Sequence, residues 1–138
     1  MTAKQYLNRV RRIDKEIDSL EEMKQKTRER LESVTQNYDS DGAQSTKDPH
    51  KYDRLVELDS LIDQRISEQI LLKKDTLATI TQLSDRVQRM VLIKYYLQMK
   101  TWEQVAVDMN YSYMHITRIH GYALREVQKI LDGRAACV

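Results

Sequence analysis

The sequence predicts an all-α protein, with a long N-terminal antiparallel helical hairpin and a C-terminal helix-turn-helix domain. Only three of its 138 residues are Gly and one is Pro, while 32% are charged. This composition favours helices over the turn-rich sheets of sandwiches and barrels. Apolar residues also recur at helical spacing over most of the chain. We expect a hairpin at residues 1–83 and a separate helix-turn-helix domain at residues 84–138.

The first helix is predicted from a seam of side chains that runs from Ala3 to Tyr38 in alternating steps of three and four residues. This spacing is typical of coiled coils, and polar residues interrupt it only at Lys24 and Thr27. The apolar stripe of such a helix needs a partner, so we expect coiled-coil-like pairing. The polar segment 39–49, rich in turn-forming residues, is predicted to be a loop.

A second amphipathic helix is predicted from Tyr52 to about Leu83, with Asp48 and Pro49 at its start. Its apolar stripe advances by about 3.6 residues per step, the period of a straight helix. The stripe consists of Leu55, Leu58 or Asp59, Ile62, Ile66, Ile70, Lys73, Leu77 and Ile80. We expect this helix to fold back on the first one. The hairpin would then be a scaffold, with direct contact to DNA as the alternative, and homo-oligomerisation through the same helices is compatible with either.

Three shorter helices are predicted in the last third of the chain. Asp85 can cap the first of them, which we expect to continue to Gln98. Thr101 and Gln104 have the spacing of a capping box, in which each side chain accepts a hydrogen bond from the other residue's backbone. This box predicts a second helix that ends near Met109.

The second and third of these helices have the spacing of a helix-turn-helix. Asn110 suits the left-handed position after a helix, and Ser112 can cap the helix that follows. The expected helix-turn-helix core is small or apolar: Val105, Ala106, Ile116, Ile119 and Ala123. The opposite face of the last helix suits a DNA major groove, whose width admits one helix. The candidate DNA-binding residues on that face are Tyr113, Met114, His115, Thr117, Arg118 and Tyr122.

The charge distribution is compatible with double-stranded DNA as the partner. Residues 1–83 hold 15 Lys and Arg against 16 Asp and Glu, a net charge of −1. Residues 84–138 hold 8 basic and 5 acidic residues, a net charge of +3. The C-terminal third is therefore mildly basic, which permits nucleic-acid binding.

Several short motifs then follow one another in an order known from one family. They are Tyr96-Leu97, the capping Thr101, Glu103-Gln104-Val105-Ala106, the capping Ser112 and Ala123-Leu124-Arg125. Over about residues 84–131 the chain resembles region 4 of sigma-70-type RNA polymerase sigma factors. With its charged helical hairpin, the whole chain also resembles small phage-encoded proteins related to the ArpU-type late-transcription regulators.

The resemblance implies a sequence-specific DNA-binding regulator of phage or prophage late genes, with host RNA polymerase as a second candidate partner. The family's base-reading positions fall on Tyr113, Met114 and Arg118, where sigma factors typically have Arg, Glu and Gln. We therefore expect a DNA target other than the usual promoter element. The chain leaves no room for the sigma parts that melt DNA, so we do not expect a complete sigma factor. The alternatives are a phage small terminase subunit for DNA packaging and a partner of host polymerase that does not bind DNA.

The sequence offers little for other chemistry. It has no Gly-rich phosphate loop and no nucleophile motif, so we expect no enzyme activity and no cofactor. His115 and His120 would lie about 140° apart on a helix, which is poor for one metal ion, and we expect them at the surface or facing DNA. The lone Cys137 excludes an intramolecular disulfide. With charges throughout and no apolar leader at its start, the chain is expected in the bacterial cytoplasm, with no membrane partner.

Overall fold

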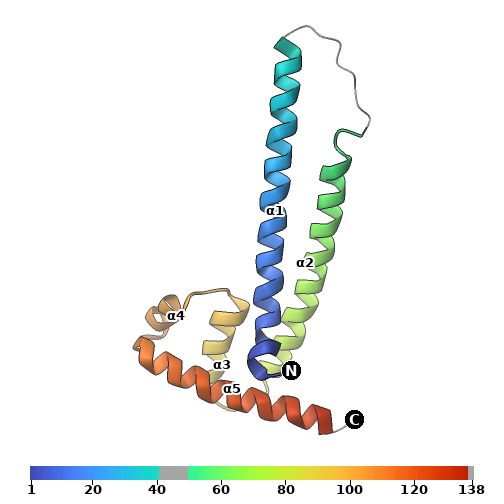
Figure 1. The fold of residues 1–138 in the computed structure, drawn as a ribbon. Coiled ribbons are helices and arrows are strands. Elements are labelled where there is room, and N and C mark those ends of the chain that lie inside the picture. The colour runs from blue at the N-terminus through green and yellow to red at the C-terminus, as the bar shows by residue number, and fades with distance from the viewer. Residues whose placement is uncertain (41–49, 137–138) are drawn as a thin grey trace. The chain divides into compact units, whose positions relative to one another are not determined.

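The computed structural model describes the backbone of residues 1–40 and 50–136 and the side chains of residues 1–33 and 50–136. Its helices are α1 (Ala3–Ser40), α2 (Asp53–Ile80), α3 (Arg86–Leu92), the π-helix η1 (Ile93–Leu97), α4 (Trp102–Met109) and α5 (Tyr113–Ala136) (Figure 1). The described residues contain no strand, and the predicted all-α class is confirmed. None of the described helices has the length and hydropathy needed to cross a lipid bilayer.

The chain packs as two compact units. The first consists of residues 1–12 and 69–138, and the second of residues 13–68. The start of α1 and the end of α2 therefore belong to the same unit as α3, η1, α4 and α5. These units are defined by packing, whereas the boundary at residue 83 divides a scaffold from a DNA-binding part. That functional division stays a prediction.

The second unit is an antiparallel pair of helices, as predicted. The buried side chains of this unit are apolar: Ile13, Ile17, Leu55, Leu58 and Ile62. The Nε atom of Arg65 donates to the Oε1 atom of Glu16 over 2.8 Å, and Lys24 forms an ion pair with Asp59. The partner of Lys24 on α2 comes earlier in the chain than the partner of Glu16, so the two helices run in opposite directions. Lys24, the polar break in the seam, thus has a charged partner across the pair.

The seam expected on α1 lies on the packed side of that helix. It is buried at Ala3, Tyr6, Val10, Ile13 and Ile17, and half-buried at Leu20, Lys24, Thr27 and Leu31. The helix continues through residues 39 and 40, which we expected in the loop. The rest of that expected loop, with Asp48 and Pro49, lies outside the described residues, as do the side chains of Val34 and Tyr38 and the residue Cys137.

The stripe expected on α2 is wrong at Ile70 and Leu77, whereas Ile80 is fully buried as expected. Ile70 and Leu77 are 60% and 42% exposed, whereas Thr76 and Thr79 are fully buried. The buried residues of α2 form two groups, Leu55, Leu58 and Ile62 near its start and Thr76, Thr79 and Ile80 near its end, and the residues between the groups are at most half-buried. The predicted stripe contained mainly apolar residues, but near the end of α2 the packed side of the helix carries Thr76 and Thr79. Their hydroxyls are small enough to be buried between helices.

The helix that we expected to continue to Gln98 changes its form after Leu92. Residues Ile93–Leu97 make a π-helix, in which the amide of Gln98 donates to the carbonyl of Ile93 over 2.9 Å. Met99 then has a φ of 58°, in the left-handed region that residues other than Gly rarely adopt. The wider turn and the positive φ end this helix and direct the chain into the Thr101 cap. No residue type in this segment signals a π-helix.

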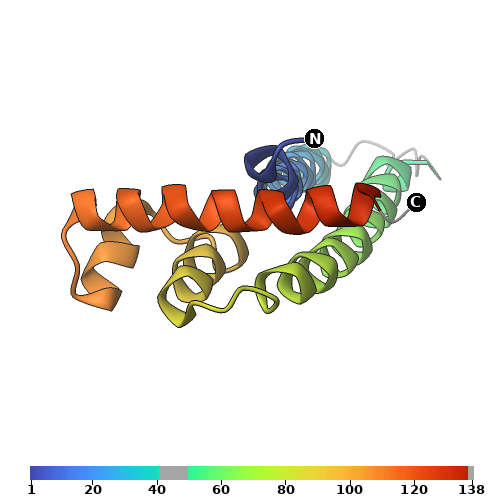
Figure 2. The same cartoon turned by 90° about the horizontal axis from the view of Figure 1, so that it is seen from below.

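The core of the first unit joins both ends of the chain. Figure 2 shows α3 and α4 along one side of α5, with the first turns of α1 along the other side. The largest fully buried side chains of this core are Leu7, Ile80, Leu92 and Tyr96, and Ala123 and Val127 of α5 are also fully buried. The first turns of α1 thus form part of the support of α5.

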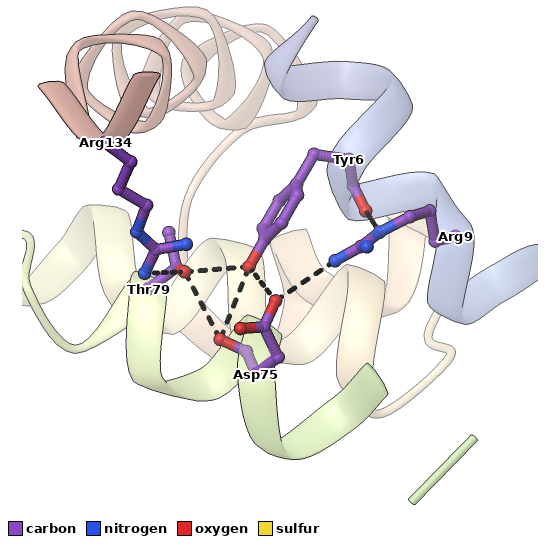
Figure 3. A network of polar contacts seen from close by, with 5 residues as sticks. All are labelled: Tyr6, Arg9, Asp75, Thr79 and Arg134. Carbon is purple, nitrogen blue, oxygen red and sulfur yellow. Dashed lines mark hydrogen bonds and ion pairs between the residues drawn. The ribbon is translucent and has the colours of Figure 1, made fainter. Parts of the chain in front are cut away.

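A polar network links α1, α2 and α5 at the edge of this core (Figure 3). The Tyr6 hydroxyl lies 2.5 Å from the Oδ2 atom of Asp75 and 2.8 Å from the Oγ1 atom of Thr79. Arg9 donates to Asp75 over 3.2 Å, and Arg134 donates to Thr79 over 2.8 Å. The hydrogen bond from Tyr6 and the charge of Arg9 hold the pKa of Asp75 below its usual value. Five side chains from three helices thus satisfy one another.

Candidate nucleic-acid interface

The two helices of the helix-turn-helix are defined by local hydrogen bonds at their ends. The Oγ1 atom of Thr101 accepts from the Gln104 amide over 3.2 Å, and the Gln104 side chain accepts from the Thr101 amide over 2.9 Å. Asn110 has a φ of 57° and ends α4 in the left-handed conformation. The Oγ atom of Ser112 accepts from the His115 amide over 3.1 Å and caps α5. The predicted capping box, turn and cap are therefore confirmed.

The expected helix-turn-helix core is distributed over two clusters. Val105, Ala106 and Ile116 pack with Val91 of α3, and Ile119 is half-buried against this cluster. Ala123 is fully buried but packs in the other cluster, with Leu7 of α1 and Ile80 of α2. The small side chain of Ala123 therefore lies where α5 meets the base of the hairpin.

All six candidate DNA-binding residues are exposed on α5. Tyr113, Met114 and Tyr122 are 54%, 67% and 56% exposed, which is high for large apolar or aromatic side chains. His115, Thr117 and Arg118 are also exposed. Ile116, on the opposite side of the helix, is fully buried. The first two turns of α5 thus present a continuous free surface, and their orientation is fixed by a buried anchor.

These six residues lie around two hollows rather than one. Met114, His115, Arg118 and Tyr122 line an open hollow on one side of the helix, together with Ser112 and Ile119. Tyr113 and Thr117 line a separate pocket on the other side. A helix of about 10–12 Å diameter fills the major groove, so both of its sides come close to a DNA strand.

The charge on this surface comes from arginines. Arg118 and Arg125 are both exposed and lie seven residues apart, so they occupy one face of α5. The guanidinium of Arg125 lies 5.7 Å from the centroid of the Tyr122 ring. Arg125 is not among the six candidate residues, and its seven-residue spacing from Arg118 is the signal in the sequence that points to it. Within the described part of the chain, neither guanidinium has a carboxylate partner.

Gly121 lies between these two arginines on the same face. A Cβ atom built at this position meets nothing within 4 Å. A glycine inside a helix is less favourable than alanine by roughly 1 kcal/mol, and packing inside the protein gives no reason for it here. The missing side chain leaves the backbone of α5 accessible between two cations.

His120 is half-buried and lines a pocket, whereas His115 is exposed as expected. The Nε2 atom of His120 lies 2.7 Å from the Tyr96 hydroxyl, and its ring is 4.6 Å from that of Trp102. Burial lowers the pKa of His120 to about 4, and the charge of Lys4 adds to this effect. His120 is therefore neutral near pH 7 and belongs to an aromatic cluster that includes the stacked pair Tyr95 and Trp102. Among the described residues, no group of three metal-binding side chains occurs.

The local geometry, with a capped short helix, a left-handed turn and a longer helix with a free N-terminal face, is that of a DNA-binding helix-turn-helix. Residues 80–129 match the family model of sigma-70, region 4. The region 4-like domain thus begins at the last residue of α2 and ends inside α5. It covers less than half of the chain and includes all six candidate residues.

The match to region 4 supports a DNA-binding helix-turn-helix role in general. It also covers the Thr101 cap, the Asn110 turn and the buried Ile116. The first turns of α1, which pack against the region 4-like domain, lie outside the match. No curated protein and no solved structure matches the chain.

Proposed function

We propose that this protein is a sequence-specific transcriptional regulator that inserts α5 into the DNA major groove and acts on phage or prophage late genes. The observation that carries the proposal is the free face of α5. On this face Arg118 and Arg125 lie without acidic partners among the described residues, while Ile116 on the opposite side is fully buried. An exposed basic face on a rigidly anchored helix is what a major-groove reader needs.

The side chains suit different parts of the DNA. The planar fork of Arg118 fits the two acceptors of a guanine edge, and the Met114 side chain suits the methyl group of thymine. Tyr113 and Thr117, on the side of the helix, have hydroxyls that suit the phosphate backbone. This division assigns base reading to Met114 and Arg118, and positioning to the other residues of the face.

The test begins with selection of bound duplexes from random DNA by the full chain. The selected duplex and a scrambled one are then titrated with the wild type, with Arg118→Ala and with the control Arg28→Ala, an exposed arginine of α1. A good contact to a base is worth about 1–3 kcal/mol, so Arg118→Ala should weaken binding to the selected duplex roughly 10- to 150-fold. The control should bind like the wild type. Equal affinity of Arg118→Ala and wild type for the selected duplex would contradict this reading of α5.

We also propose that the N-terminal helices mediate homo-oligomerisation. Support comes from apolar side chains of α2 that are exposed in the single chain, namely Val56, Ile70, Leu71 and Leu77. Light scattering on the full chain measures the number of subunits. A dimer agrees with a regulator that reads two half-sites, whereas a ring of many subunits would favour a DNA-packaging role. Capture of host RNA polymerase without any DNA binding would instead favour the polymerase-partner alternative.

A further inference from the structure

A pocket of about 200 Å³ lies beside α5, on the side of Tyr113 and Thr117. The first turns of α1 form its other wall with Lys4 and Asn8. This end of α1 is held against α5 because the Ala3 amide donates a 2.7 Å hydrogen bond to the Oε1 atom of Gln128. The pocket therefore joins a segment outside the region 4-like domain to the helix proposed to read DNA.

The pocket is rich in hydrogen-bond donors that have no partner. Within the described part of the chain, neither the side-chain amide of Asn8 nor the indole N–H of Trp102 forms a hydrogen bond, and Lys4 forms no ion pair. His120 also lines the pocket and is neutral near pH 7 because burial lowers its pKa to about 4. None of the described residues that line it is acidic, so Lys4 supplies its only charge. Free donors with one ammonium and no carboxylate suit an anion.

The position of the pocket suggests where such an anion comes from. A helix in the major groove has a DNA strand along each side, because its diameter nearly equals the groove width. Tyr113 and Thr117 lie on the side of α5 away from the hollow formed by Met114 and Arg118. A strand that follows this side meets the opening between α5 and α1.

We infer that this pocket is a phosphate site, formed by Lys4 and Asn8 of α1 together with Trp102, which holds a backbone phosphate of the bound DNA. The assignment to DNA rests on the proposed function, whereas the affinity of the pocket for a phosphate group does not. A free phosphate or a small phosphorylated molecule offers the same chemistry. In either case the N-terminal helix is part of the binding surface and not only a scaffold.

The chain has a single tryptophan, Trp102, and this residue lines the pocket. Its indole ¹⁵N–¹H resonance is therefore a single signal that comes from a residue of the pocket. We would record it while adding the selected duplex, a scrambled duplex, or inorganic phosphate at matched ionic strength against chloride. Both duplexes should shift the resonance, since a phosphate contact does not depend on sequence. Inorganic phosphate should shift it too, at higher concentration.

Two variants test the contact itself. Lys4→Met removes the ammonium group and keeps the apolar stem, and it should make the slope of log affinity against log salt shallower by about 0.9, the value for one phosphate. Asn8→Asp places a carboxylate in the pocket at nearly constant shape and should weaken binding of both duplexes more than Lys4→Met does. Lys15→Met, at an exposed lysine of α1 outside the pocket, is the control with the same change in net charge. Melting curves verify that each variant is folded.

The outcomes separate this inference from the proposed function. Shifts with the duplexes and with phosphate, both reduced by Asn8→Asp, support the site and its occupation by DNA. A shift with phosphate alone supports the site and assigns it to a small anion, whether or not the chain binds DNA. If neither ligand moves the Trp102 resonance and Lys4→Met has the same salt slope as Lys15→Met, the phosphate site is refuted. DNA binding by α5 is then decided by the titration of Arg118→Ala.

Discussion

The guanidinium of Arg11 lies 4.1 Å from the centroid of the Tyr95 ring, and its Nη1 atom donates a 2.5 Å hydrogen bond to the Tyr95 carbonyl. Tyr95 belongs to the π-helix η1 and stacks on Trp102 of α4 at a centroid distance of 3.7 Å. One arginine of α1 therefore supports both the irregular turn and the start of the helix-turn-helix. No pattern in the sequence connects residues 11 and 95.

Arg11→Ala should destabilise the fold. The substitution removes a charged hydrogen bond worth about 1.5–3 kcal/mol and a cation–π contact worth about 0.5–1 kcal/mol. Thermal or urea unfolding measures the loss, with Arg12→Ala as the control because Arg12 is the exposed neighbour. Equal stability of the two variants would show that the contacts between Arg11 and Tyr95 do not stabilise the fold.

Tyr6→Phe should raise the pKa of the Asp75 carboxyl toward its ordinary value, since the Tyr6 hydrogen bond is the largest cause of its lowering. It should also reduce the free energy of unfolding by about 1 kcal/mol near pH 7. The folded-state pKa of Asp75 is lowered, so this stabilisation is present above the unfolded pKa and is lost as the pH falls through the folded value. Carbon-detected titration of Asp75 and unfolding at several pH values measure both effects. Tyr52→Phe, at a tyrosine that is 54% exposed, should change neither quantity.

Acidification from pH 6.5 toward pH 4 should destabilise the protein through His120. Its pKa is lowered from 6.5 to about 4 in the folded chain, so over this range the unfolded chain binds a proton that the folded chain does not. The contribution to stability is therefore complete above pH 6.5 and declines by at most about 1.4 kcal/mol per pH unit below it. Unfolding of wild type and His120→Gln at pH 7 and pH 5 tests this, and the variant should lack this decline. His115→Gln, at the exposed histidine, should keep it.

Ile116→Ala should reduce both stability and DNA binding. The Ile116 side chain of α5 is fully buried against α4 and Val91 of α3. Truncation of such a side chain to alanine costs about 2–5 kcal/mol. Met114→Ala is a useful comparison, because Met114 is 67% exposed on the same helix. It should melt like the wild type and lose affinity only for the selected duplex. A Met114→Ala protein that is as unstable as Ile116→Ala would place Met114 in the core and contradict the described face.

DNA affinity should fall with salt at a slope of roughly −2 to −3 per subunit, at about 0.9 per phosphate neutralised. The cations on the proposed surface are few, namely Arg118, Arg125 and Lys4. Fluorescence anisotropy with labelled duplex over a range of NaCl concentrations measures the slope. Affinity that is unchanged between low and high salt would exclude DNA as the main ligand.

The caps and turns of the helix-turn-helix were predictable because their hydrogen bonds join residues at most five positions apart. Thr101 and Gln104 satisfy each other, and Asn110 takes the left-handed position that its residue type tolerates. These choices depend on neighbours in the chain and are therefore visible in the amino-acid order. The same holds for the buried seam of α1, whose periodicity survives in the folded protein.

The sequence by itself therefore determined the helical class, the helix-turn-helix and the exposed character of the six α5 residues. Only the tertiary structure shows that Thr76 is buried on α2 and Ile70 is exposed, because the residues that pack against α2 lie far away in the chain. It also decided the environment of His120 and brought Lys4 to the side of Thr117. Burial and the meeting of distant side chains depend on how the helices pack, and a single-sequence pattern records only neighbours along one helix.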